Sequence, residues 1–168
     1  MPTNFQLARL YRFLSSEQSN DLEFSLRGNV AVQRNIRALK DFFESLVDLE
    51  VKYKTPSEEY KEFENKRNDL IKEHAVKDDK GEPLAEKGGI RIQDAEAFNK
   101  ALGVLVGEYT EVIEAQKSKA NEWEEYLHSD SDIEIAMIEE SDMKFDTLSK
   151  VNFETLSVMV KSTEESEG

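Results

Sequence analysis

The side chains best suited to metal or acid-base chemistry are the two histidines, His74 and His128, and the numerous carboxylates. A zinc hydrolase needs two histidines at a fixed helical spacing, as in His-Glu-x-x-His, and the chain has no such pair. His74 falls on the apolar side of a predicted helix, so we expect a packed, hydrogen-bonded ring there. The absence of cysteine excludes thiolate ligands, thiol nucleophiles and disulfides.

One acidic segment has the spacing of a calcium loop. Asp130, Asp132 and Glu134 occupy the first, third and fifth positions of such a loop. The sixth position requires glycine and is Ile135, and no glutamate stands at the twelfth. We therefore expect no calcium site.

Phosphate-binding glycine motifs are also incomplete. Gly88-Gly89 lacks a following Lys-Ser/Thr, and Gly103-x-x-x-Gly107 lacks a preceding strand, so nucleotide binding is not expected. The pairs Glu124-Glu125 and Glu139-Glu140 could hold a divalent ion weakly, although such runs are usually solvated. An enzyme with a carboxylate pair and a metal is a third functional hypothesis. No cofactor is expected.

Carboxylates dominate the charge of the chain. The 168 residues include 36 acidic and 22 basic side chains, and the net charge is -14. Residues 1–40 carry +3, residues 41–120 carry -6 and residues 121–168 carry -11. Because an acidic surface repels nucleic acid and anionic lipid, we expect no direct binding to either. No window approaches the roughly 20 apolar residues of a membrane span, and the N-terminus lacks the apolar core of a signal peptide, which predicts a soluble, cytoplasmic protein.

The first part of the chain reads as two helices separated by a strand. Thr3 and Gln6 have the spacing of a capping box at the start of a short amphipathic helix. The alternation of apolar and polar residues over 22–26 predicts a short strand. Gly28-Asn29 then separates this strand from a second helix over 30–54.

Residues 55–127 are expected to form two long helices that fold back on each other. Thr55 at the N-cap and Pro56 at the first position start the earlier helix. Turn residues over 78–92 predict a small β-hairpin or looped cap at the tip. Asp94 caps the later helix, which continues to about Leu127. The apolar stripe of the earlier helix is predicted at Tyr60, Phe63, Leu70, Ile71 and His74.

Gly103 and Gly107 lie one turn apart inside the later helix, where glycine costs roughly 1 kcal/mol relative to alanine. We expect close packing against the N-terminal helices there, with a self-association face as the alternative. Beyond residue 130, the apolar run 133–138 predicts a strand, residues 139–149 a loop and residues 153–161 a last short helix.

The fold class that follows is mainly α, an antiparallel helical hairpin or bundle with a small β element. We expect one domain over 1–161, with the hairpin 55–127 projecting from it, and a disordered acidic tail over 162–168.

The tip and its borders resemble small uncharacterised proteins of tailed bacteriophages. The matching stretches are NDLIKEHAVKDDKGEP over 68–83 and IQDAEAFNK over 92–100. In that family a helix leads to an Asp-Glu-Gly tip, a second helix opens near a Glu-Ala-Phe-Asn-Lys-like stretch, and a short strand and a small C-terminal helix follow. The likeness extends in order of elements over 30–160. It implies a phage origin and no catalytic residues.

The leading hypothesis is a non-enzymatic phage accessory protein of the host cytoplasm that binds another protein, in virion assembly or in host interference. The alternative is an acidic DNA mimic that inhibits a host nucleic-acid-binding enzyme, because carboxylates along helices can imitate phosphates. A continuous negative stripe would favour mimicry, and mixed signs an ordinary protein interface. Homo-oligomerisation stays open. The candidate partner-binding residues are Glu108, Glu111, Glu114, Trp123, Glu124, Glu125, Asp130 and Asp132.

Overall fold

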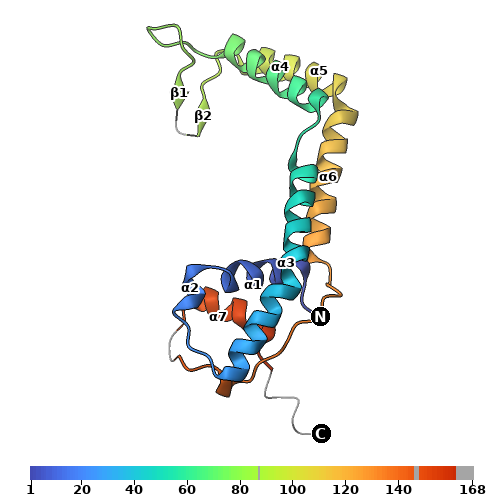
Figure 1. The fold of residues 1–168 in the computed structure, drawn as a ribbon. Coiled ribbons are helices and arrows are strands. Elements are labelled where there is room, and N and C mark those ends of the chain that lie inside the picture. The colour runs from blue at the N-terminus through green and yellow to red at the C-terminus, as the bar shows by residue number, and fades with distance from the viewer. Residues whose placement is uncertain (87, 146–147, 162–168) are drawn as a thin grey trace. The chain divides into compact units, whose positions relative to one another are not determined.

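The computed structural model describes residues 1–86, 88–145 and 148–161 and is mainly helical (Figure 1). Its helices are α1 (Asn4–Leu14), α2 (Glu17–Asn20), α3 (Leu26–Lys54), α4 (Glu58–His74), α5 (Ala95–Glu108), α6 (Thr110–His128) and α7 (Lys150–Leu156), with short 3-10 helices η1 (Glu140–Asp142) and η2 (Ser157–Met159). Strands β1 (Ala85–Glu86) and β2 (Gly89–Ile90) pair antiparallel. The predicted fold class, mainly α with a small β element, is confirmed. The predicted acidic tail, 162–168, lies outside the described residues.

The chain divides into two compact units. Unit 1 combines Met1–Lys52 with the segment from Trp123 onward, and unit 2 is Tyr53–Glu122. The predicted arrangement of one domain over 1–161 with a projecting hairpin stays a prediction. Among the helices that the structure describes, none combines the length and apolar content of a membrane span.

Unit 1 is built around α1, whose capping box is confirmed. The Gln6 amide donates to Thr3 Oγ1 at 3.3 Å, and the Thr3 amide donates to Gln6 Oε1 at 2.9 Å. The helix buries residues at three- and four-residue spacing, as an amphipathic helix must, and packs against α7 and η2. The buried core cluster consists of Leu7, Leu10, Phe13, Leu14, Phe24, Ala31, Val32, Leu39, Ile138, Leu156 and Met159.

The predicted strand over 133–138 is wrong. This segment is extended, but its only ladder contact among the described residues is an isolated parallel bridge from Ile138 to Val160. Its neighbour is α3, and a helix offers no free main-chain groups for pairing. The side chain of Asn35 takes that role instead. Asn35 Nδ2 donates to the Ala136 carbonyl at 2.9 Å, and the Ala136 amide donates to Asn35 Oδ1 at 2.6 Å.

The predicted strand over 22–26 and the break at Gly28-Asn29 are also wrong, because α3 already begins at Leu26. Ser25 caps the helix by accepting from the Gly28 amide at 3.0 Å, and Phe24 makes a single antiparallel bridge to Met143. Glycine is needed at position 28 for close approach. A Cβ there would lie 3.0 Å from the Cβ of Phe24 and 3.2 Å from the Cβ of Asp142.

Beyond residue 138, the predicted loop over 139–149 contains the short helix η1, and the predicted last helix over 153–161 is displaced toward the N-terminus. It consists of α7 from Lys150 and the 3-10 turn η2. Ser149 Oγ accepts from the Asn152 amide at 3.3 Å and caps α7. This cap explains why the helix begins before the apolar run that suggested it.

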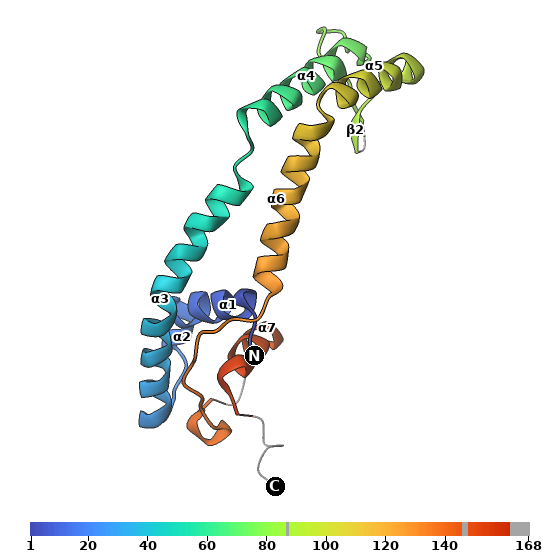
Figure 2. The same cartoon turned by 90° about the vertical axis from the view of Figure 1, so that its right-hand side faces the viewer.

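In unit 2, α4 and α5 lie side by side and antiparallel (Figure 2). The predicted start at Thr55-Pro56 is wrong, since Ser57 is the N-cap and its Oγ accepts from the Tyr60 amide at 3.1 Å. Within the predicted apolar stripe of α4, Phe63 is buried and the other four members are half-buried. The rings of Phe63 and Tyr109 lie 5.6 Å apart between the two helices.

The predicted β-hairpin at the tip is confirmed. Asp78 Oδ1 accepts from the amides of Lys80 at 2.8 Å and Glu82 at 3.0 Å, and Gly81 has a φ of 82° that favours glycine. The Val76 amide donates to the Arg91 carbonyl at 2.8 Å. Main-chain bonds therefore connect the ends of α4 and α5 through the tip.

The predicted continuous helix from Asp94 to Leu127 is wrong, although its cap is confirmed. Asp94 Oδ1 accepts from the Glu96 and Ala97 amides at 3.1 and 3.0 Å. The helix is interrupted at Tyr109. Thr110 Oγ1 donates to the carbonyls of Val106 at 3.0 Å and Gly107 at 3.2 Å, and such back-bonding bends helices.

The predicted close packing of Gly103 and Gly107 against the N-terminal helices stays a prediction, because those helices belong to unit 1. Among the described residues of unit 2, a Cβ added at either glycine would meet nothing within 4 Å. Both glycines are exposed on α5. Unit 2 itself therefore leaves this side of α5 uncovered over the described residues.

These two environments predict opposite effects of the same substitution. We expect Gly103→Ala to stabilise α5 by about 1 kcal/mol, because alanine favours a helix and the site is open. We expect Gly28→Ala to destabilise α3 by about 1 to 3 kcal/mol, because the added methyl overpacks the contact with Phe24 and Asp142. Amide hydrogen exchange, resolved by peptide, should slow in α5 for the first variant and quicken near residue 28 for the second. Slower exchange in both would contradict the contact at Gly28.

The Asn35 bridge predicts a large cost for a small truncation. Asn35→Ala removes both hydrogen-bond partners of the half-buried main chain of Ala136, and we expect a loss of about 2 to 4 kcal/mol in the free energy of unfolding. Urea unfolding followed by the fluorescence of Trp123, the single tryptophan, measures unit 1. The control is Gln33→Ala, which removes an exposed amide from the same helix and should change stability by less than about 0.5 kcal/mol.

Candidate functional site

The candidate partner-binding residues fall in both units. Glu108, Glu111 and Glu114 belong to unit 2 and are exposed. The remainder, from Trp123 to Asp132, belong to unit 1. The structure therefore gives two separate groups, and each is described on its own.

The unit 2 group differs from the neighbouring helix α4 in charge balance. Four of the six acids of α4 are paired with cations three or four residues away, in the pairs Glu58–Lys61 (2.6 Å), Glu62–Lys66 (2.9 Å), Glu64–Arg67 (3.3 Å) and Asp69–Lys72 (3.4 Å). Such exposed pairs add little stability but neutralise the face that carries them. Within the described ranges, Glu108, Glu111 and Glu114 have no ion pair. Three successive carboxylates at the end of α5 and the start of α6 are therefore not compensated by an ion pair, as only Glu59 and Glu73 are on α4.

A polar network fixes the position where α5 ends. Lys66 Nζ donates to the Tyr109 hydroxyl at 2.7 Å, and that hydroxyl donates to Glu62 Oε1 at 2.9 Å. The hydrogen bonds from Lys66 and Tyr109 lower the pKa of Glu62, and the bonds to Tyr109 and Glu62 raise the pKa of Lys66. Glu62 and Lys66 therefore both stay charged near neutral pH. The network joins α4 to the residue that follows Glu108.

In unit 1, Trp123 is only 4% exposed, and its ring lies 6.1 Å from that of Tyr126. Its indole is thus a packing group in this structure and is not displayed for a partner. Glu124, Glu125, Asp130 and Asp132 are exposed, and Glu124 Oε2 lies 3.7 Å from His128 Nε2.

The segment that carries Asp130 is held by the N-terminus of α1. Asp130 forms an antiparallel bridge with Thr3, and the next amide, of Ser131, donates to the Pro2 carbonyl at 2.9 Å. The buried Asn4 side chain donates to the Tyr126 carbonyl at 2.9 Å and to Ser129 Oγ at 3.1 Å. This anchoring presents the carboxylates on a fixed backbone.

In the part of the chain that the structure describes, no group of three His, Cys, Asp or Glu side chains could hold a metal ion. His74 is half-buried with its ring 5.8 Å from Phe98, edge to face. His128 is exposed, with its ring 5.9 Å from Phe5. Both histidine rings thus pack against aromatic neighbours.

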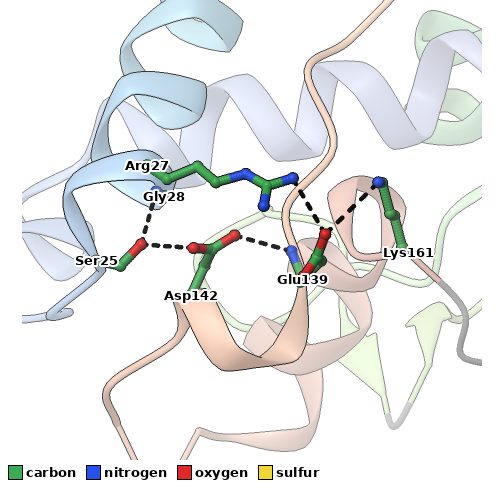
Figure 3. Close-up of polar contacts among 6 residues, drawn as sticks. All are labelled: Ser25, Arg27, Gly28, Glu139, Asp142 and Lys161. Atoms are coloured by element: carbon green, nitrogen blue, oxygen red, sulfur yellow. Dashed lines mark hydrogen bonds and ion pairs between the residues drawn. The ribbon is translucent and has the colours of Figure 1, made fainter.

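Sequence reasoning missed the cluster at the start of α3 that Figure 3 shows. Ser25 Oγ donates to Asp142 Oδ1 at 2.5 Å while it caps the helix through the Gly28 amide. Asp142 Oδ2 accepts from the Glu139 amide at 3.1 Å. The Ser25 hydroxyl, followed by the Glu139 amide, lowers the pKa of the buried Asp142 carboxyl. This carboxylate is an anchor for the helix terminus and a poor general base.

Cations surround the cluster. Glu139 Oε1 lies 3.1 Å from Arg27 Nη2 and 3.7 Å from Lys161 Nζ (Figure 3). All three side chains are largely exposed, so the pairs contribute little individually. The sequence feature that could have indicated this helix start is the capping spacing of Ser25 and Gly28. The alternation of apolar and polar residues over 22–26 suggested a strand there instead.

Two shallow hollows, of about 320 and 530 Å³, flank Arg9 between α1 and α7. Arg9 Nη2 donates to Thr155 Oγ1 at 3.1 Å, and its guanidinium lies 5.7 Å from the centre of the Phe5 ring. Carboxylates of Glu17 and Glu154 line the same hollows. Arg9 is therefore engaged in packing, and Arg12, which also lines the larger hollow, lies 5.1 Å from the centre of the Phe43 ring.

Comparison of the chain with protein-family models, with curated proteins and with solved structures found no match. The resemblance to phage proteins therefore stays a prediction. The functional argument rests on the exposed charges and apolar side chains described in the two units.

The Asp142 anchor predicts a pH-dependent contribution to stability. Because its pKa is lowered in the folded state, the ionised carboxylate stabilises unit 1 above the ordinary value of 3.8, and this contribution disappears as pH falls through the folded-state pKa. We expect Asp142→Asn to have a lower thermal midpoint than the parent at neutral pH, with a gap that closes in acid. The exposed, unbonded carboxylate of Asp132 gives the control, Asp132→Asn, which should show almost no gap at any pH. A gap for Asp142→Asn that is independent of pH would contradict the assignment.

Proposed function

We propose that this protein is a non-enzymatic accessory factor of a tailed bacteriophage that acts by binding another protein. The partner presents a basic surface, and the contact includes the carboxylates of Glu111 and Glu114 at the start of α6. The host cytoplasm is the compartment of action, in virion assembly or in interference with the host. The phage assignment follows from the resemblance of the tip at 68–83 and of the stretch 92–100.

The observation that supports binding is the contrast between two helices of unit 2. Four of the six carboxylates of α4 are paired with lysine or arginine of the same helix, whereas Glu111 and Glu114 are exposed and have no ion pair among the described residues. Charges left uncompensated on a surface attract a complementary partner and accelerate its association. The anchored end of α5 holds them in a fixed direction within unit 2.

The same contrast favours a protein partner over the alternative, a DNA mimic. A mimic of the phosphate backbone needs an unbroken series of negative charges. Mixed signs occur along α4, and Lys117 and Lys119 interrupt the acidic series of α6. An ordinary interface with local charge complementarity fits this pattern better.

A matched pair of charge variants tests the proposal. Glu111→Gln with Glu114→Gln removes two uncompensated charges, and Glu64→Gln with Asp69→Asn removes two that are already paired. The parent and both variants, each immobilised, are exposed to lysates of infected and uninfected host cells at near-physiological salt. We expect a specific protein that the parent and the α4 variant retain and the α6 variant loses at least about tenfold, a change of 1.4 kcal/mol.

Two further measurements separate the alternatives. Retention should fall at high salt, since screening weakens exposed charge pairs. Displacement of the retained protein by duplex DNA would favour the mimic. Equal recovery of every protein by all three forms would exclude the proposed role of Glu111 and Glu114.

A further inference from the structure

The outer side of α3 carries apolar and cationic residues over its first turns. Leu26 is 84% exposed and Val30 is 52% exposed. Arg34 and Arg37 follow on the same helix and are exposed as well. At 100° per residue, the four positions fall within an arc of about 80°. This arc, which we call the α3 face, lies opposite the side of the helix that is buried in unit 1.

The two arginines of the α3 face carry positive charge that unit 1 does not compensate. Neither Arg34 nor Arg37 has an ion pair among the described residues. The cations on either side of them along the helix are engaged. Arg27 lies 3.1 Å from Glu139 (Figure 3), and Lys40 lies 3.9 Å from a glutamate of its own helix.

We propose that the α3 face binds a segment of another protein that carries both apolar and acidic side chains. The apolar side chains cover Leu26 and Val30, and the carboxylates bind the guanidinium groups of Arg34 and Arg37. Arginine can hold a carboxylate through two parallel hydrogen bonds, and it is enriched at protein interfaces. The face is about 16 Å long, which is the length of about eleven residues of a helix or about five of a strand.

The surrounding charges select a short acidic segment over nucleic acid or anionic lipid. Asp41 and Glu44 are exposed and continue the same side of α3 beyond Arg37. These carboxylates, within a chain of net charge -14, repel an extended polyanion. A segment that ends beside Arg37 avoids them. The apolar pair also has no counterpart on a phosphate backbone and is matched by apolar side chains.

The inference goes beyond the proposed function, because it concerns unit 1 and a partner of the opposite charge. It uses neither Glu111 nor Glu114. Failure of the one interaction therefore leaves the other unaffected, and separate variants measure the two.

Peptide selection on the full chain tests the proposal. A displayed library of random peptides is bound to the immobilised parent, and binders of the double variant Arg34→Gln with Arg37→Gln are then removed. We expect the peptides that remain to combine aspartate or glutamate with large apolar residues. Removal that leaves no peptide, or only peptides without carboxylates, overturns the proposal.

Dissociation constants of one selected peptide, made synthetically, test each half of the face. Arg34→Gln with Arg37→Gln should raise the dissociation constant at least about tenfold, because both carboxylate contacts are lost. Leu26→Gln with Val30→Gln should raise it by a similar factor, because the apolar cover is lost. An acidic peptide whose affinity is unchanged by the second pair contradicts the proposed apolar contact.

Matched changes elsewhere in unit 1 give the controls. Lys52→Gln with Lys150→Gln removes two exposed cations outside the α3 face. Val47→Gln with Val51→Gln replaces two valines of α3 that are 39% and 62% exposed. Both should change the dissociation constant by less than about twofold. Circular dichroism establishes that every variant keeps its helix content.

Two competition measurements assign the occupant. Displacement of the peptide by duplex DNA or by phosphatidylserine vesicles would assign the α3 face to a phosphate surface and overturn the proposal. Sedimentation of the parent alone should give 19.3 kDa. A larger mass that Leu26→Gln with Val30→Gln restores to this value would assign the face to a second copy of the chain.

Discussion

Unit 1 depends on the hydrogen bonds between the Asn35 side chain and the main chain of Ala136, two residues separated by 101 positions. A partly buried extended segment needs partners for its covered amides and carbonyls, and a sheet is the usual source. Here a helix supplies them through one amide side chain, which is 1% exposed. The bond pair fixes the register of the segment on α3 and thereby directs Ile138, two residues later, into the core between α3 and η2.

The same solution recurs at the start of α3. There, the hydrogen bond between the Ser25 hydroxyl and the Asp142 carboxylate holds the later part of the chain against the helix terminus. Single main-chain bonds add to it, such as the one from the Ser25 amide to the Asp142 carbonyl at 2.8 Å. In unit 1, isolated polar contacts around an apolar core thus hold the later part of the chain against the earlier part. Unit 2 relies on local elements, namely ring packing between α4 and α5 and the small hairpin at its tip.

The helical period and the helix caps could be predicted from the sequence because they depend on residues close together in the chain. Thr3 with Gln6 and Asp94 marked helix starts correctly, and the fold class followed. The strand predicted over 133–138 was wrong because apolar spacing reports burial and does not report which group supplies the hydrogen bonds. The break at Tyr109 depends on the rotamer of Thr110, which composition does not reveal.

The candidate site was predictable only in part. Exposure of Glu108, Glu111 and Glu114 follows from their charge, but their lack of cation partners depends on which faces α4 and α6 present. Trp123 was expected on an outer face and is buried, because the spacing of one aromatic residue does not show which side of a helix is covered. For the glycine pair, the sequence left both close packing and a self-association face open, because helix propensity does not show what covers a helix.

The interrupted layout of unit 1 has a consequence for biosynthesis. When α3 leaves the ribosome, the residues that cover its buried stripe, Ile138, Leu156 and Met159, have not yet been made. Unit 2 is continuous in sequence, and all of its residues emerge before the second part of unit 1. At 5 to 20 residues per second, the 101 positions between Asn35 and Ala136 correspond to roughly 5 to 20 seconds of translation. During that interval α1 is the part of the core already made that can cover α3, so the rest of its apolar stripe stays exposed, as in the partly folded chains that chaperones bind.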